Sequence, residues 1–542
     1  MAGLAVVLVV ALALRLFGIT WGLPDETHLF SYHPDEFHSL RGAFSLALGD
    51  ANPHFFNYGS LYLYLVAATV AISNPALFSQ VAVAVPGGPV LPEVLRTWTL
   101  DARVLTVILG VATVAVVYAT ARRIWGHREG LAAGLLLALA PLHVLHSHYA
   151  TVDVPGALFT ALACYFAVVM VGWLSWRSVL WAGVAAGLAA SVKYSGGAAL
   201  VAPVVAWGIV WWRDRERDRP PQWAKLVALP AAALAAFAMT SPYTFIDWQS
   251  AWRDISFEME HMRVGDDPAM IALHPSGWLF HLGNVAQGTG FIMLAAAAVG
   301  LGAGLSARRR ELLPPAVFGL VAFVMIGGAE VRYARYAVPL LPVVAVLAAG
   351  VVSMDPFTAV RGRWRSWATA GAVSVVMVGS VLAAGLMSHR MLGELVGPDA
   401  RAEALALLED RVPRDGAIGL VSEPWFYHPP VDYCNGGVAL RGNPLWGAYH
   451  RPIRDLRVVG LDAARLADEA PGAMVLTGVE IGVRRAAGDT QAAEFDRALI
   501  ELGYELTARF RAGPWEGRGG RPIAQDLTYP FPTIEVWLRG SE

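Results

Sequence analysis

Lysine and cysteine are nearly absent from this sequence. Lys193 and Lys225 are the only lysines among 41 basic residues, so arginine supplies almost all of the positive charge. The two cysteines lie in sequence surroundings of different polarity: Cys164 is in an apolar run and Cys434 is in a polar region. A disulfide between them is not expected, which excludes a fold held together by disulfide bonds.

Charge of either sign is also scarce. Only 15% of the 542 residues are charged, whereas soluble domains carry roughly 25%. The net charge of −2 gives no basic excess of the kind that indicates nucleic-acid binding. The chain is instead 56% hydrophobic with a mean hydropathy of +0.48, which indicates a polytopic α-helical membrane protein.

Repeated apolar runs predict about eleven membrane spans. The first run lacks a preceding basic segment and a following small-residue cleavage site, so it is read as an uncleaved span. The run at 57–72 is short and flanked by Pro and Gly, which favours an interfacial or re-entrant helix. The sequence KYSGG divides the 179–212 run into two spans. The other candidate spans are 3–23, 101–121, 131–149, 154–174, 224–246, 279–305, 314–330, 336–354 and 367–387.

Four arginine clusters predict the orientation in the membrane, because basic loops stay in the cytoplasm. The resulting scheme has a cytoplasmic N-terminus and an extracytoplasmic C-terminal tail. It also brings the unusual polar segments to the outer face: 24–100, 146–154, 193–197, 243–278 and 329–336. The clusters lie at 121–128, 213–219, 307–311 and 361–365.

The composition changes near residue 390. A helical pattern is followed by three short β-like runs, GAIGLVSEP, GAMVLTG and TIEVWLRG. We therefore predict a membrane domain over 1–388, with a first outer loop at 24–100, and a soluble extracytoplasmic α/β domain over 389–542.

The first outer loop concentrates ionisable groups in FSYHPDEFHSL, residues 30–40. Pro34 is suited to the first position of a helix, which puts Asp35 and Glu36 in the first turn. Helix capping explains one acid but not two acids flanked by His33 and His38. The stretch is interpreted as an active site at the membrane surface, against the alternative of a solvated polar loop.

A second acid, Asp153, lies at the outer end of another predicted helix. Two acids that converge from separate segments suit a general base with a supporting partner. A simple helix N-cap is the alternative for Asp153.

Positive charge is predicted on the same face. Arg332 and Arg335 are three residues apart and share one face if the segment is helical, with Tyr333 beside them. Such a set suits a lipid-linked phosphate, although an interfacial anchor is the alternative. Lys193 either joins them or extends to the membrane surface.

Taken in order, several stretches resemble the GT-C superfamily of integral-membrane glycosyltransferases, especially bacterial relatives of the protein O-mannosyltransferases and of the lipid A aminoarabinose transferase. They cover the membrane half of the chain but not the C-terminal domain. The stretches are HPDE (33–36), NPHFFNYGSLYLYL (52–65), residues 121–159, GLAASVKYSGG (187–197) and RYARYAVPLLP (332–342).

The resemblance implies transfer of a sugar from a polyprenyl-phosphate carrier to a lipid, glycan or protein acceptor, in the cytoplasmic membrane of a bacterium. It implies Asp35 as catalytic base with Glu36 beside it, and Asp153 as the second acid. It assigns the donor phosphate to Arg332 and Arg335, and with them Lys193 and Tyr333. Direct displacement predicts inversion, and a donor outside the cell needs no nucleotide-binding motif.

Further candidates come from the polar residues of the same loops. A metal-free site is the first expectation, and Zn²⁺ or Mn²⁺ held by His33, Glu36 and His148 is the alternative. A transporter or flippase of lipid-linked sugars is the competing function, and it predicts paired broken helices. A non-catalytic surface assembly protein is a third possible function.

The candidate acceptor or substrate contacts are His33, His38, His54, Asn57 and Tyr58.

Overall fold

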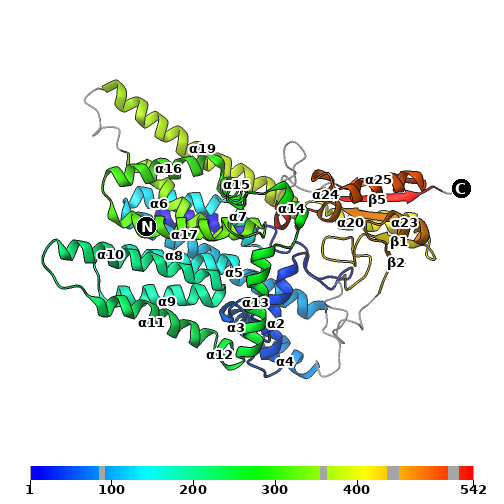
Figure 1. Cartoon of the computed structure of the whole chain (residues 1–542), viewed down its shortest axis with the longest axis horizontal. Helices are drawn as coiled ribbons and strands as arrows, with labels where there is room; N and C mark the ends of the chain where they lie inside the picture. The colour runs from blue at the N-terminus through cyan, green and yellow to red at the C-terminus, as the bar shows by residue number, and fades with distance from the viewer. Residues whose placement is uncertain (1, 85–91, 355–362, 436–450, 511–523, 541–542) are drawn as a thin grey trace.

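A computed structural model describes residues 2–84, 92–354, 363–435, 451–510 and 524–540. Long helices form a bundle, and a small region with a β-sheet lies beyond one end of it (Figure 1). The first half of the chain contains α1 (Ala2–Leu16), α2 (Pro34–Ala47), α3 (Leu61–Ser73), α4 (Pro75–Ala84), α5 (Pro92–Ile124), α6 (His127–Leu139), α7 (Pro141–His146), α8 (Asp153–Gly172), α9 (Trp176–Val192), η1 (Tyr194–Leu200), α10 (Val201–Arg215), α11 (Trp223–Thr240), α12 (Tyr243–Ile246) and α13 (Trp248–Val264).

The bundle continues through a second set of helices that ends in one long element. This element, α19, contains the predicted domain boundary at 388/389, so a single helix carries the chain from the bundle to the C-terminal region. The elements are α14 (Pro268–Leu273), α15 (Gly277–Thr289), α16 (Phe291–Ser306), η2 (Arg310–Leu312), α17 (Leu313–Gly327), η3 (Ala334–Leu340), α18 (Leu341–Ala348), η4 (Ala349–Ser353) and α19 (Arg363–Val396).

Within the described ranges, seven helical segments are long and apolar enough to cross a membrane, or eight if the bent pair α15–α16 counts as one span. Three shorter apolar helices accompany them: α1, α3 and α9. The multi-pass helical architecture is thus confirmed, while the number of about eleven spans is not confirmed. The bend of 103° between α15 and α16 occurs at Gly290, whose φ of +86° favours glycine.

Two of the predicted apolar runs are each divided into two helices. Pro141 starts a new helix, so the predicted 131–149 run becomes α6 and α7 with a bend at Ala140. Lys193 separates α9 from η1, which confirms the break predicted at KYSGG. The run at 57–72 becomes the 13-residue helix α3, shorter than a membrane span.

Arginine clusters are found at the end of the bundle away from the C-terminal region. The turn between α10 and α11, with cluster 213–219, is at the end of the bundle opposite the C-terminal region (Figure 1). Arg309 donates to the carbonyl of Ile124 at 2.6 Å, so the clusters at 307–311 and 121–128 are neighbours. The cluster at 361–365 lies largely outside the described residues.

At the other end, α2 and α13 run across the ends of the long helices (Figure 1). Acidic side chains of α13 and its N-cap hold the first loop in three places. Asn52 donates to Asp247 at 3.0 Å, the Phe56 amide to Asp254 at 3.1 Å, and Asn57 to Glu258 at 2.7 Å. A different face of α13 is exposed and carries Trp248, Trp252 and Met259.

The C-terminal region contains the predicted small α/β fold. Its five-stranded sheet has the order β2-β1-β3-β5-β4. Strands β2, β1 and β3 are parallel, and β5 is antiparallel to both of its neighbours, β3 and β4. The three β-like runs of the sequence form β1, β3 and β5 as predicted. The elements are α20 (Ala400–Arg411), β1 (Ala417–Leu420), β2 (Asp455–Val458), α23 (Ala463–Glu469), β3 (Ala473–Thr477), η5 (Gly478–Gly482), α24 (Val483–Ala486), α25 (Thr490–Glu501), β4 (Tyr504–Phe510), α26 (Gln525–Thr528) and β5 (Ile534–Arg539).

Candidate active site

The helix α2 begins at Pro34, as the sequence predicts, and His33 is its N-cap. The Asp35 amide donates to His33 Nδ1 at 3.3 Å, which holds the first turn in place. Neighbouring residues on a helix point about 100° apart, so Asp35 and Glu36 enter different surroundings.

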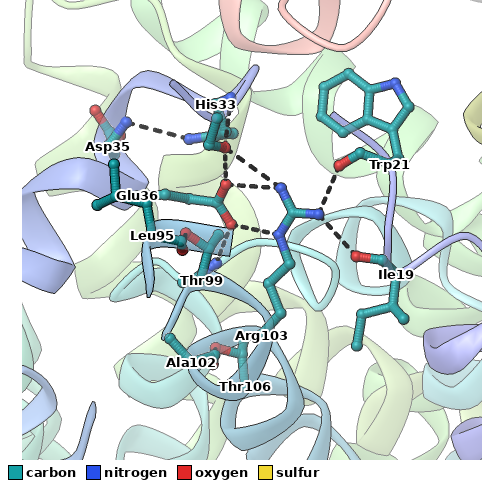
Figure 2. A network of polar contacts seen from close by, with 12 residues as sticks. Ile19, Trp21, His33, Asp35, Glu36, Leu95, Thr99, Ala102, Arg103 and Thr106 are labelled. Carbon is teal, nitrogen blue, oxygen red and sulfur yellow. Dashed lines mark hydrogen bonds and ion pairs between the residues drawn. The ribbon is translucent and has the colours of Figure 1, made fainter. Parts of the chain in front are cut away.

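Glu36 is fully buried and paired with Arg103 of α5 (Figure 2). Arg103 Nε and Nη2 donate to the two carboxylate oxygens at 2.7 and 2.8 Å. The carboxylate also accepts from the Ala150 amide at 2.8 Å and from the Ser31 hydroxyl. Burial would raise the pKa of Glu36, but the Arg103 guanidinium holds that pKa below its ordinary value. Glu36 therefore fixes α2 against two other segments and has no free oxygen lone pair directed at Asp35.

Arg103 also donates to the carbonyls of Ile19 and Trp21 at 2.7 and 2.6 Å (Figure 2). Sequence reasoning missed this residue, although an arginine inside an apolar helix is a signal in itself. The bidentate pair sets the position of the helix that carries Asp35.

Asp35 faces Arg335 at the start of η3. Arg335 Nη1 lies 2.9 Å from Asp35 Oδ2, and both side chains are largely buried. Burial would raise the pKa of Asp35, but the Arg335 guanidinium outweighs it and holds the pKa below its ordinary value. The carboxylate is therefore ionised at neutral pH. It can accept a proton, and it lies beside the fixed positive charge of Arg335.

The second predicted acid, Asp153, forms a parallel ion pair. Lys193 Nζ donates to Asp153 Oδ1 at 3.0 Å, and the same ammonium lies 4.5 Å from the centre of the Tyr336 ring. Asp153 is the first residue of α8, and Val152 occupies the N-cap position, so the simple N-cap alternative is wrong. Lys193 also contributes to the field at Asp35, which makes the two ion pairs one cluster.

Arg332 lies apart from this cluster. Residues 331–333 are not helical and η3 begins at Ala334, so the condition under which Arg332 and Arg335 would share one helical face is not met. Arg332 donates to the His274 carbonyl at 3.1 Å, to the Ala329 carbonyl and to Glu330 at 3.1 Å.

Tyr333 lies under Arg335, whose guanidinium carbon is 4.2 Å from the ring centre. Its hydroxyl donates to Asp266, so its ring rather than its hydroxyl supports the cationic group.

Of the first-loop candidates, some lie near the cluster of ion pairs and others lie apart from it. Tyr58 lies in the field of Asp35 and Arg335, and burial raises its pKa well above the ordinary value, so its hydroxyl keeps its proton. Asn57 is engaged with Glu258, and His54 is at the surface, 2.7 Å from Asp50. His38 stacks on the Phe55 ring at 5.0 Å between centres.

Two fully buried histidines, His33 and His146, have unsatisfied ring nitrogens at the cluster, and Nδ1 of the partly buried His38 is another such atom. Because His33 Nδ1 accepts a hydrogen bond, the neutral ring carries its proton on Nε2. In the described part of the chain, no partner faces His33 Nε2, the Tyr149 hydroxyl or either nitrogen of His146. Buried polar atoms are nearly always bonded, so three such side chains around two ion pairs indicate a place for a polar ligand. Sequence reasoning did not select His146 or Tyr149.

The proposed metal ligands do not assemble. Glu36 is occupied by Arg103, and the ring nitrogens of His148 lie 2.8 Å from the carbonyls of Phe17 and Val144. Among the described residues, no group of three His, Cys, Asp or Glu side chains is arranged to hold a metal ion. The residues His33, Glu36 and His148 thus do not fit a metal centre.

A cavity of 190 Å³ adjoins α2 and reaches the C-terminal region. Its walls include His33 and His38 together with Trp425 and Phe426. Of the residues that the structure describes, neither Asp35 nor Arg335 is in its lining. The cavity is thus next to Asp35 in the fold, because His33 bonds to the Asp35 amide and His38 lies three residues further along α2.

Comparison with known proteins gives a consistent result. The model of the dolichyl-phosphate-mannose-protein mannosyltransferase family matches residues 93–244, which include Arg103, Asp153 and Lys193. The structure of ArnT from Cupriavidus metallidurans bound to undecaprenyl phosphate aligns with a TM-score of 0.51 and 17% identity, covering 100% of this chain and 99% of that chain. The chain has the GT-C fold.

A second solved structure supports the same fold. The Archaeoglobus fulgidus oligosaccharyltransferase tethered to an acceptor peptide aligns with a TM-score of 0.52 and 14% identity, over 96% of this chain and 74% of that one. No curated protein matches the chain in sequence. The resemblance predicted from the sequence motifs is confirmed at the level of this GT-C membrane fold.

Proposed function

We propose that this GT-C protein is an inverting glycosyltransferase that moves a sugar from a polyprenyl-phosphate carrier to an acceptor hydroxyl. The observation that carries the proposal is the buried Asp35–Arg335 pair, 2.9 Å apart, beside the Asp153–Lys193 pair. One cluster thereby holds an ionised base and two cations that suit a phosphate.

In the proposed reaction, the acceptor oxygen attacks the anomeric carbon of the donor and forms the new glycosidic bond. The bond between that carbon and the phosphate oxygen breaks, and the acceptor proton moves to Asp35. Negative charge grows on the departing phosphate, where Arg335 and Lys193 stabilise it. No other oxidant, reductant or co-reactant is needed for the balance.

The two ion pairs give this scheme an order. A phosphate bound by Arg335 and Lys193 competes with Asp35 and Asp153 for the same cations. As Arg335 turns to the phosphate, Asp35 loses the charge that lowers its pKa and becomes a stronger base. Donor binding thus prepares the base. The acceptor is assigned to the 190 Å³ cavity, because its lining includes His33, which bonds to the Asp35 amide, and His38, which follows Asp35 by three residues on α2.

The decisive assay is product formation. Purified protein in lipid bilayers is given polyprenyl-phosphate sugars, one donor at a time, with a panel of lipid, glycan and peptide acceptors. Release of polyprenyl phosphate with a matching glycosylated product is the expected result. Movement of labelled donor across the bilayer without any release would favour the transporter or flippase instead. The bend between α15 and α16 is the observation that favours a transporter, although transporters of this kind have such broken helices in pairs.

Arg335 and Arg332 offer a matched pair of variants. Arg335→Gln is expected to lower kcat about 10²–10³-fold, because it removes a preorganised cation from the leaving phosphate. Arg332→Gln breaks buried bonds to Ala329, His274 and Glu330, so it is expected to lower the unfolding temperature. Because that guanidinium does not face Asp35, kcat of the folded variant is expected to change by less than about threefold. Initial rates with saturating donor measure both. Equal losses in the two variants would contradict the assignment of the phosphate to Arg335.

His146 is proposed to contact a hydroxyl of the donor sugar. His146→Phe keeps a ring but removes both nitrogens, and we expect the KM for donor to rise up to about tenfold through the loss of one or two hydrogen bonds. His54→Gln, at the surface beside Asp50, is the control and is expected to leave KM unchanged. The measurement is KM for several donors that differ by one deoxygenated position. A wild-type KM in His146→Phe for every donor would remove His146 from the site.

A further inference from the structure

A residue of the C-terminal region reaches the cluster from outside the bundle. Asp526 of α26 is fully buried, and its two carboxylate oxygens accept from the backbone amides of Ala334 and Arg335 at 2.8 and 2.7 Å. The contact joins residues 191 and 192 positions apart in the chain. It therefore connects the C-terminal region directly to the residue that faces Asp35.

The two bonded amides are those at the start of η3. The first amides of a helix have no acceptor within the helix, so the acceptor comes from a side chain, water or a ligand. The preceding residues, 331–333, are not helical, and Tyr333, the N-cap of η3, has an extended backbone. Asp526 supplies both acceptors at once, and so determines where the backbone of Arg335 lies. The side chain of Arg335 then reaches Asp35 Oδ2 at 2.9 Å.

The same short segment is also held on the first-loop side. Arg401 donates to the Tyr529 carbonyl at 3.2 Å, and its guanidinium carbon lies 3.9 Å from the Tyr32 ring centre. Tyr32 precedes Asp35 by three residues. Residues 526–529 thus contact the backbone of Arg335 at one end and, through Arg401, the approach to Asp35 at the other.

We propose that Asp526 is a positioning residue that sets Arg335 relative to Asp35, so that the C-terminal region completes the catalytic cluster. The proposal rests on the proposed glycosyl transfer for its kinetic consequence, but not for the structural connection itself. Asp526 acts through the η3 backbone and touches neither donor nor acceptor.

The chemistry of the contact requires an ionised carboxylate. Burial raises the pKa of Asp526 to about 6, while Arg335 and the two amides act in the opposite direction. Most molecules therefore carry the anion at neutral pH, with both oxygens free to accept. An asparagine of the same shape has one oxygen and an NH₂ group, and the NH₂ cannot accept from the second amide.

The test compares Asp526→Asn with a matched variant, Asp489→Asn. Asp489 also accepts from two backbone amides, those of Gln491 and Ala492, but it caps α25 within the C-terminal region. We expect Asp526→Asn to lower kcat about tenfold, the effect of a poorly oriented catalytic group, with KM for donor nearly unchanged. Asp489→Asn is expected to keep the wild-type kcat.

Hydrogen–deuterium exchange of the full-length protein measures the contact between Asp526 and the η3 backbone independently of glycosyl transfer. Peptides that cover residues 331–340 are expected to exchange faster in Asp526→Asn and at the wild-type rate in Asp489→Asn. This readout separates the two proposals. Faster exchange in a protein whose wild type shows no transfer contradicts the proposed function and supports the connection, whereas unchanged exchange overturns the connection.

A double-mutant cycle then asks whether Asp526 acts through Arg335. In the Arg335→Gln background, Asp526→Asn is expected to cause no further loss of kcat. A second loss as large as that in the wild type would overturn the positioning role. If Asp526→Asn fails to fold, Asp526→Glu serves in its place, because it keeps both acceptors on a longer stem. It is expected to lower kcat without faster exchange in 331–340, and a wild-type kcat would count against the proposal.

Discussion

Asp35→Asn is expected to lower kcat by about 10²–10⁴-fold, the usual contribution of a general base. Asparagine keeps the size of the side chain and an acceptor for Arg335, but it cannot take the proton of the acceptor hydroxyl. KM for donor is not expected to rise, since Arg335 is released from a charged partner. The measurement is the initial rate of polyprenyl-phosphate release with saturating donor and acceptor.

Asp50→Asn is the control for the loss of an acid from the same loop. Asp50 is half-exposed and pairs with His54, so its removal is expected to leave kcat unchanged. Thermal unfolding of both variants in the same bilayers separates a lost base from a lost fold. Near-wild-type turnover by Asp35→Asn, with the protein intact, would refute the assignment of the base.

Glu36→Gln is expected to destabilise the protein by about 3–5 kcal/mol, the cost of leaving a buried charge without its partner. Arg103 would keep its positive charge in a site where Glu36 is fully buried and bonded at both oxygens. The helix that carries Asp35 is held by this pair, so transfer is expected to fall as well. The midpoint of thermal unfolding and the rate of transfer measure the two effects.

The paired variant Glu36→Gln with Arg103→Met tests the reason for that loss. Replacing both members of a buried ion pair costs much less than breaking it. The double variant is therefore expected to unfold at a higher temperature than Glu36→Gln alone. An unfolding temperature as low as that of the single variant would mean that the loss does not come from the unpaired Arg103.

Much of the fold could be predicted because its signals are local. Apolar length marks the long helices, and Pro34 starts α2 where the sequence places it. The three β-like runs become strands for the same reason. Strands β2 and β4 were missed, since their exposed residues lack a continuous apolar run and their place depends on β1 and β5. The bend at Ala140, just before Pro141, divides a stretch that composition alone reads as continuous.

The candidate site was only partly predictable, because pairing between distant segments leaves no local signal. Charge type and position along the chain selected Asp35, Asp153, Lys193 and Arg335, and the structure brings these four together. The same reasoning selected Arg332, whose three-residue spacing from Arg335 implied one face only if the segment was helical. Nothing in the local pattern of Asp526 points to Arg335, since the connection appears only after the C-terminal region has folded onto the bundle.

The helix α13 has a consequence for how this protein should be handled. Its acids hold residues 52–57, while its exposed Trp248 and Trp252 are of the type that resides among lipid headgroups. A detergent micelle replaces that headgroup layer with a curved and mobile surface. We therefore expect the first loop, and with it Tyr58, to be held less firmly in micelles than in nanodiscs. The turnover rate measured in micelles would then differ from the rate in nanodiscs, because the first loop is held differently at the site.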